Sequence, residues 1–306
     1  MAKLYVFGIG GTGSRVLRSL TMMLAAGVDT NGYDIVPIVI DPDSSNYDLT
    51  LNFKLMKLYN DIYGKLNFSQ SKNNFFHTPI RSDLVNNLFK IKNTSNKSFR
   101  EFISLATMDK STQAMTKLLF SDLNLNSSMD VGFRGNPNIG SVVLNQIVTP
   151  ENGQDLNPVS EDFMKFANSF ASGDKIFIIS SIFGGTGASG FPLLLKSLRL
   201  NSNIPNQNLI NNAEIGAITV LPYFKLKTKP GSEVNSDTFI SKARAALGYY
   251  ENNIVNDINA LYFIADDVFN QYDHNEGGES QQDKAHLIEF FAATSIIDFA
   301  HKSFTN

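Results

Sequence analysis

Two stretches of the chain share one pattern: a short apolar run, a glycine-rich turn, then apolar residues at helical spacing. The first run, Leu4–Phe7, enters the turn Gly8–Ser14, and the second, Ile176–Phe183, enters Gly184–Gly187. A strand that turns tightly into a helix presents backbone N–H groups and a helix N-terminus to an anion. Glycine is needed where a side chain would block the approach of a phosphate. The pattern therefore predicts two strand–turn–helix units, each suited to hold a phosphate.

Other segments extend this alternation of strands and helices. Ile35–Ile40, Glu214–Leu221 and Ala260–Ile264 are typical of buried strands, and helices are expected around 163–170 and 239–254. A chain of 306 residues is long enough for one large α/β domain or two ordinary ones. We expect an α/β fold with a Rossmann-like, mostly parallel sheet and helices on both faces.

Two regions depart from the alternation. Residues 49–129 contain helical patterns separated by asparagine-rich pieces, which predicts an inserted, mostly helical segment, either a surface decoration or a lid. The last region, 284–304, is apolar nearly all round, as in a helix buried from several sides. We expect it to be a core helix.

Composition excludes several classes of function. A formal net charge of −3 gives no electrostatic footprint for nucleic acid. The absence of cysteine excludes disulfides and thiolate metal sites, and four scattered histidines do not favour a zinc site. No apolar run is long enough to span a membrane, and the N-terminus does not resemble a signal peptide. We therefore expect a cytoplasmic protein.

The first glycine turn alone leaves two interpretations open. Gly8, Gly10 and Gly13 have the G-x-G-x-x-G spacing of a dinucleotide-binding fingerprint, and Asp41 follows the next strand, where a ribose ligand is expected. These residues are compatible with a nicotinamide-dependent enzyme. A third glycine turn, Gly135-Asn136-Pro137, opens another helix and adds another candidate for binding an anion.

The three turns, GIGGTGS, GNPNIG and GGTGASGFP in this order, resemble those of the tubulin/FtsZ family of GTP-binding filament proteins. The resemblance continues in Ile218–Phe224, Leu261–Phe269 and Glu289–Ile297, which look like two strand ends and the start of the core helix of that family. The bacterial FtsZ-like branch is nearer than eukaryotic tubulin. The resemblance implies one GTP-binding domain over 1–306, with GTP or GDP and Mg²⁺ as ligands.

The resemblance also implies the roles of individual residues. Asp41 and Asp43 would approach the Mg²⁺ and γ-phosphate, Asp266 would accept hydrogen bonds from guanine, and Phe290 would stack on the base with Thr294 near its edge. The three turns would hold the phosphates through Gly10, Gly11, Thr12, Gly13, Ser14, Gly135, Asn136, Gly184, Gly185, Thr186, Gly187 and Ala188.

The chain departs from the family at several positions. Arg15 replaces an asparagine and could bind a phosphate bidentately, whereas Phe183 and Ser189 replace glycines of the central loop. The family's catalytic acidic loop and C-terminal domain, which follow the core helix, have no counterpart in this sequence. We therefore expect a GTP-binding protein whose GTPase activity needs self-association or a partner chain. The alternatives are an interaction module that binds GTP without hydrolysing it and, less favoured, the nicotinamide-dependent enzyme.

Overall fold

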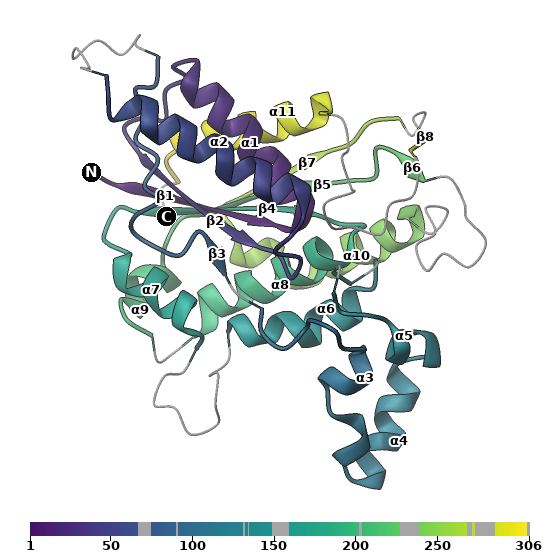
Figure 1. The fold of residues 1–306 in the computed structure, drawn as a ribbon. Helices are drawn as coiled ribbons and strands as arrows, with labels where there is room; N and C mark the ends of the chain where they lie inside the picture. The colour runs from purple at the N-terminus through teal and green to yellow at the C-terminus, as the bar shows by residue number, and fades with distance from the viewer. Residues whose placement is uncertain are drawn as a thin grey trace.

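The structure is a computed structural model that describes residues 1–66, 75–89, 91–130, 132–133, 135–148, 159–201, 204–226, 239–267, 271–272 and 285–304. Its centre is a six-stranded sheet in which every neighbouring pair is parallel. The order across the sheet is β3-β2-β1-β4-β5-β7 (Figure 1). The strands are β1 (Lys3–Ile9), β2 (Asp34–Ile40), β3 (Leu88–Phe89), β4 (Lys175–Ser181), β5 (Ile215–Val220) and β7 (Ala260–Ile264).

Helices cover both faces of this sheet (Figure 1). One face carries α1 (Gly10–Ala25), α2 (Tyr47–Tyr63) and α11 (Leu287–His301), with α1 packed against both others. The other face carries α6 (Pro137–Leu144), α7 (Glu161–Ser169), α8 (Gly185–Leu200), α9 (Gln207–Asn211) and α10 (Phe239–Asn253). The expected α/β architecture is thus confirmed.

Burial on both faces explains why the central strands are continuous apolar runs. Every residue of β2, β4 and β5 is buried, as is every residue of β1 after Lys3. A strand covered on both sides cannot alternate apolar with polar residues. Aromatic rings fill the space under β1, where the ring centroids of Tyr5 and Phe7 lie 5.1 and 5.2 Å from that of Phe166 on α7. These contacts fix α7 against the centre of the sheet.

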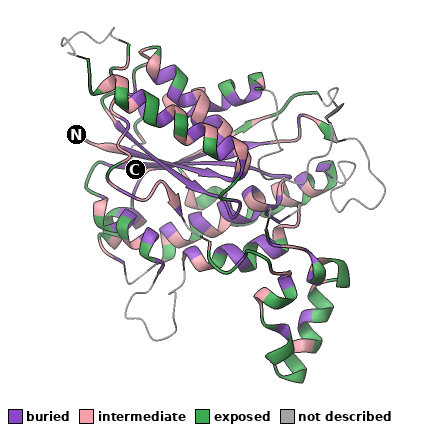
Figure 2. Cartoon of the chain, viewed as in Figure 1, coloured by how far each residue is buried: buried purple, intermediate pink, exposed green. Residues whose placement is uncertain are grey.

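The segment 49–129 contributes both to the main fold and to a projection from it. Its first part supplies most of α2, which packs on α1, and the edge strand β3. Its second part forms α3 (Phe99–Phe102), α4 (Lys110–Leu119) and α5 (Asp122–Asn126), which project from the body and are largely exposed (Figures 1 and 2). The helical character of the segment was predicted, whereas the strand β3 was missed, because two residues give no periodic signal.

The remaining described elements are short. Leu105–Thr107, Asn145–Ile147 and Val255–Asp257 form 3₁₀ turns, and β6 (Lys225–Leu226) pairs with β8 (Gln271–Tyr272) in a small parallel ribbon. None of the described helices is long and apolar enough to cross a membrane.

Helix α11 corresponds to the predicted core helix, except that Lys284 lies outside the described residues. Its inner face packs on α1, β5 and β7, and Phe299 is fully buried against Phe177 of β4, with ring centroids 5.4 Å apart. Its N-terminal turn is different, because Leu287, Phe290 and Phe291 are 64%, 45% and 49% exposed. The apolar composition all round therefore reflects burial along one side and exposure of large apolar side chains on the other.

The close packing of α11 on the sheet depends on Gly216 in β5. A Cβ atom at this position would lie 2.6 Å from Cδ2 of Phe299 and 2.8 Å from Cδ2 of Phe177. We expect Gly216→Ala to lower the free energy of unfolding by about 1–3 kcal/mol, because both rings are fully buried and must shift. Urea denaturation measures the change.

Gly248 in α10 provides the matched control, because no heavy atom lies within 4 Å of its Cβ position. Gly248→Ala should raise the free energy of unfolding by about 0.5–1 kcal/mol, since alanine favours a helix interior. Equal effects of the two substitutions would show that α11 is not held against β5 as described.

Candidate functional site

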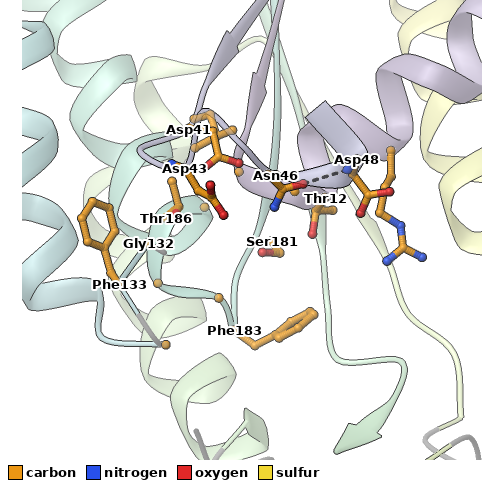
Figure 3. A pocket seen from close by; sticks show the side chains of 18 of the residues that line it. Thr12, Asp41, Asp43, Asn46, Asp48, Gly132, Phe133, Ser181, Phe183 and Thr186 are labelled. Carbon is orange, nitrogen blue, oxygen red and sulfur yellow. Dashed lines mark hydrogen bonds between the residues drawn. The ribbon is translucent and has the colours of Figure 1, made fainter. Parts of the chain in front are cut away.

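A cavity of about 240 Å³ opens at the carboxyl edge of the sheet. From β1 the chain moves outward to β2 and β3, while β4, β5 and β7 continue on the other side. The strand order thus changes direction between β1 and β4, and ligands of open α/β sheets bind in the crevice outside such a point. The residues that follow β1, β2, β4 and β5 all contribute to the lining of the cavity (Figure 3).

The two glycine turns identified in the sequence meet in this cavity. Gly10 has φ +70°, and a Cβ atom on it would lie 3.3 Å from Cβ of Thr186. Gly187 is equally confined, since its Cβ position is 2.7 Å from the backbone N and O of Ser181. Glycine at these two positions is therefore required by the packing of the protein itself.

Gly11 has no such structural reason to be glycine. The nearest heavy atom to its Cβ position is Nδ2 of Asn46 at 3.9 Å, and its φ is not positive. Alanine would fit there and would favour the helix that it opens. Because Gly11 lines the cavity, its missing side chain leaves room for a ligand to approach the backbone.

Two helices begin in the cavity without a side-chain cap among the described residues, and a third begins beside it. The two are α1 after Ile9 and α8 after Gly184, and the third is α6, which starts after Asn136; none has an acidic residue in its first turn. By contrast, α2, α4 and α7 are capped by the side chains of the residues that precede them, Asn46, Asp109 and Ser160. An uncapped N-terminus leaves N–H donors and the positive end of the helix dipole available to an anion.

Carboxylates gather on one side of the cavity, where Asp41, Asp43 and Asp48 line it (Figure 3). The backbone N–H of Asp43 donates to Oδ1 of Asp41 over 3.0 Å, and Asn46 accepts a hydrogen bond of 2.9 Å from the N–H of Asp48. Burial, opposed by the hydrogen bond from the N–H of Asp43 and assisted by the charges of Asp43 and Asp48, raises the pKa of Asp41 to about 7.

The residues present suit Mg²⁺ only together with a ligand. Among the described residues, no group of three or more histidine, aspartate or glutamate side chains is placed to hold a metal ion. Mg²⁺ commonly binds through one or two carboxylates plus the phosphates of a substrate. Asp41 and Asp43 supply those carboxylates beside the uncapped helices, so they fit Mg²⁺ that arrives with a phosphate.

A buried charge network lies behind the cavity and reaches α11. Arg15, which lines the cavity, forms an ion pair with Glu289, a residue only 2% exposed. Arg18 joins the same network, at 3.8 Å from Glu289 and 3.2 Å from Asp48. Two arginines thus balance two carboxylates, and Glu289 holds Arg15 in an ion pair.

Aromatic side chains line the cavity where the family pattern has a glycine. Phe183 is 6% exposed, and its ring centroid lies 5.6 Å from that of Phe224 and 5.1 Å from that of Phe239. Tyr223 also lines the cavity and packs on Phe224 at 4.9 Å. The phenylalanine in place of glycine is therefore accommodated by an aromatic cluster formed by residues after β4 and β5 and by α10.

Ser189, the other glycine replacement, is explained by contacts within and between helices. Its hydroxyl donates to the Gly185 carbonyl over 2.7 Å, within α8. A Cβ atom on Gly140 would lie 2.2 Å from that hydroxyl oxygen, so a glycine in α6 makes room for the serine. Ser189 therefore fits between the two helices without widening the turn Gly184–Gly187.

The structure brings together most, but not all, of the predicted site residues. The predicted residues that line the cavity are Gly10, Gly11, Thr12, Arg15, Asp41, Asp43, Gly135, Gly184, Gly185, Thr186 and Gly187. The predicted residues that do not line it are Gly13, Ser14, Asn136, Ala188, Asp266, Phe290 and Thr294. Asp266 is exposed after β7, while Phe290 follows Glu289 and so lies one residue from the partner of Arg15.

Sequence analysis did not assign several residues that line the cavity. These are Ile9, Asn46, Asp48, Gly132, Phe133, Ser181, Tyr223 and Phe224. Asn46 and Asp48 carried a usable signal, because an asparagine followed two residues later by an aspartate is typical of a helix start next to a strand end. The others become neighbours only through the sheet order, which a single sequence does not reveal.

Comparison with known proteins found no matching family model and no matching curated protein. Among solved structures, the chain is similar to CetZ from Methanosaeta thermophila, with 15% identity, a TM-score of 0.40, and coverage of 87% of this chain and 46% of that one. It is also similar to the GDP-bound monomer of CetZ1 from Haloferax volcanii, with 12% identity, TM-score 0.46, and coverage of 97% and 58%.

A third similar structure is FtsZ of M. jannaschii, with 15% identity, TM-score 0.43, and coverage of 100% of this chain and 59% of that one. The chain thus spans about half of the length of each of these three proteins. All three are tubulin/FtsZ-type proteins, the family that the glycine turns of the sequence resemble.

Proposed function

We propose that the cavity binds the phosphates of a guanine nucleotide together with Mg²⁺, and that the chain is a GTP-binding member of the tubulin/FtsZ family. The observation that carries this proposal is the meeting of two uncapped helix N-termini, those of α1 and α8, at the point where the strand order changes direction, with Gly135 of the turn before α6 beside them. Their amides supply donors for several phosphate oxygens at once. The unconstrained Gly11 leaves room for one of those phosphates to approach the backbone.

The acidic side of the cavity gives the bound phosphates a counter-ion. Asp41 and Asp43 would repel a free polyphosphate, but they attract Mg²⁺, which phosphate oxygens also bind. When bound, Mg²⁺ neutralises phosphate charge. Because the pKa of Asp41 is raised to about 7, its carboxyl is partly protonated near neutral pH when no cation is bound.

We assign the guanine base to the β7 side of the carboxyl edge of the sheet. Asp266 follows β7, which pairs with β5, so both strands end at the same edge as the cavity. An ionised carboxylate at that position accepts from N1–H and N2–H₂ of guanine, which adenine does not offer. Phe290, 45% exposed at the start of α11, supplies a ring face for stacking.

Hydrolysis needs an acid from another chain. The carboxylates that line the cavity are engaged, because Asp41 and Asp43 hold the cation and Asp48 pairs with Arg18 at 3.2 Å. Among the described residues that line the cavity, no carboxylate remains to position an attacking water, and phosphoryl transfer depends on such positioning. We infer that turnover requires self-association or a partner chain, so phosphate release per chain should rise with protein concentration. A protein that binds GTP without turnover at every concentration would be the interaction module instead.

A nicotinamide-dependent enzyme fits the cavity less well. In that interpretation Asp41 would bind ribose hydroxyls, a role that suits an accessible, ionised carboxylate. Asp41 is instead 6% exposed, and its pKa is raised to about 7. Such an enzyme would also leave the uncapped starts of α6 and α8 without a function.

Binding of GTP, ATP and NAD in the presence of Mg²⁺ tests the proposal, measured by calorimetry on wild type and on Asp266→Ala. Wild type should prefer GTP, and the variant should lose about 1–3 kcal/mol of GTP binding with little loss for ATP, because guanine loses its acceptor. Equal losses for both nucleotides would remove Asp266 from the base site. Binding of NAD alone would overturn the family assignment.

The variant Gly11→Ala tests whether the turn binds phosphate without disturbing the fold. The free energy of unfolding should stay unchanged or rise slightly, because the Cβ atom meets no heavy atom closer than 3.9 Å. GTP affinity should fall at least about tenfold, since the methyl group occupies the space of an approaching phosphate. Gly248→Ala is the control, and it should leave affinity unchanged. Wild-type affinity in Gly11→Ala would show that phosphate does not approach this turn.

The pH dependence of Mg-GTP binding should report the protonation of the Asp41 carboxyl. Below pH 7 this carboxyl holds a proton that Mg²⁺ must displace, so the affinity for Mg-GTP should rise about tenfold per pH unit up to 7 and then level off. Asp41→Asn should bind more weakly at pH 8 and show a flatter profile, which separates this titration from that of the nucleotide phosphates. An unchanged slope would contradict the assignment.

The protonation of Asp41 also affects the stability of the protein in the absence of ligand. Burial raises the folded-state pKa above its unfolded value of 3.8, so the protonated form is favoured by folding. The stabilisation is present at low pH and is lost as the pH rises through 7. Asp41→Asn should therefore gain stability over wild type between pH 5 and 8.

A further inference from the structure

A second cavity, of about 510 Å³, lies between α6, α8 and α10 on the face of the sheet opposite α1 (Figure 1). We call it the α8–α10 groove. Its volume is in the range of small-molecule sites, about 300–1,000 Å³. It is distinct from the cavity at the helix starts, because the two share no lining residue in the part of the chain that the structure describes.

The walls of the groove are mainly apolar. The groove is lined by Pro192 and Leu193 of α8, by Ala245 and Tyr249 of α10, and by Pro137 of α6. Tyr249 is 44% exposed. An apolar or aromatic body that fills this space would remove apolar surface from water on both sides.

The charges at the groove are all of one sign. Lys196 and Lys242 line it, and no aspartate or glutamate does among the described residues. Lys242 is half-buried and forms no ion pair with any described residue, and its Nζ donates to the Gly135 carbonyl over 2.9 Å. Burial lowers the pKa of this ammonium, which means that its charge is incompletely compensated.

We propose that the α8–α10 groove binds an amphiphilic organic anion, whose apolar body lies between α8 and α10 and whose acidic group meets the ammonium of Lys242. An ammonium has three donors, and the Gly135 carbonyl uses one of them. A carboxylate or sulfonate can take the others and compensate the charge. The proposal does not depend on the proposed function, because it concerns other residues and applies to the protein without nucleotide.

Lys242 connects the groove to the proposed nucleotide cavity, because it lines the groove and contacts Gly135. Gly135 lines the nucleotide cavity with φ +73°, and its carbonyl is the acceptor of Lys242. An anion that draws Lys242 into the groove therefore acts on the turn before α6. Binding is tested without nucleotide so that the two sites are measured separately.

Titration with 8-anilinonaphthalene-1-sulfonate, followed by its fluorescence, tests the proposal. Wild type should bind one equivalent saturably, and decanoate should displace it. The uncharged N-phenyl-1-naphthylamine, which has the same aromatic body, should bind at least tenfold more weakly. Equal affinity of the charged and uncharged probes, or fluorescence that never saturates, would overturn the proposal.

Substitutions then locate the bound probe. Ala245→Phe fills the groove from an exposed position and should weaken sulfonate binding at least tenfold, and Lys242→Met should weaken it severalfold while leaving the uncharged probe unaffected. Ala171→Phe is the matched control. It fills a different cavity, of about 510 Å³ at the start of β4, and Ala171 is exposed as Ala245 is. Binding that survives Ala245→Phe, or that Ala171→Phe abolishes instead, would show that the probe binds elsewhere.

Discussion

The contact between the glycine turns after β1 and β4 determines the rest of the site. Parallel pairing of these strands, with Leu4 opposite Lys175, brings their ends together, and the confined Gly10 and Gly187 let the turns touch. The helices that follow, α1 and α8, then begin at one point and leave on opposite faces of the sheet. Two helix dipoles and their amides therefore converge on the cavity.

Buried charges make this arrangement possible and connect it to α11. Asp48 and Glu289 are buried, and Arg15 and Arg18 compensate their charges. Breaking a buried pair leaves an uncompensated charge, so these residues constrain one another. Because Arg15 lines the cavity and Glu289 belongs to α11, one ion pair connects the N-terminal turn of α11 to the cavity.

The sequence allowed the α/β fold, five of the six strands and most of the glycine positions to be predicted, because continuous apolar runs and glycine turns are local signals. Tyr223 and Phe224 were missed as site residues because they meet Phe183 only through the sheet order. The engagement of Arg15 by Glu289 was missed for the same reason, since 274 positions separate the two residues. Whether Asp266, Phe290 and Thr294 contact a base stays a prediction, because they lie outside the cavity lining.

The most direct test of the central claim observes the amides themselves. In protein labelled with ¹⁵N-glycine, addition of Mg-GDP should shift the backbone N–H resonances of Gly11, Gly185 and Gly187, which line the cavity at the two helix starts. Gly32 and Gly248, which do not line the cavity, should stay unchanged. Saturable shifts confined to the first group would support a phosphate site built from helix N-termini. Nucleotide binding that leaves those three amides unmoved would contradict it.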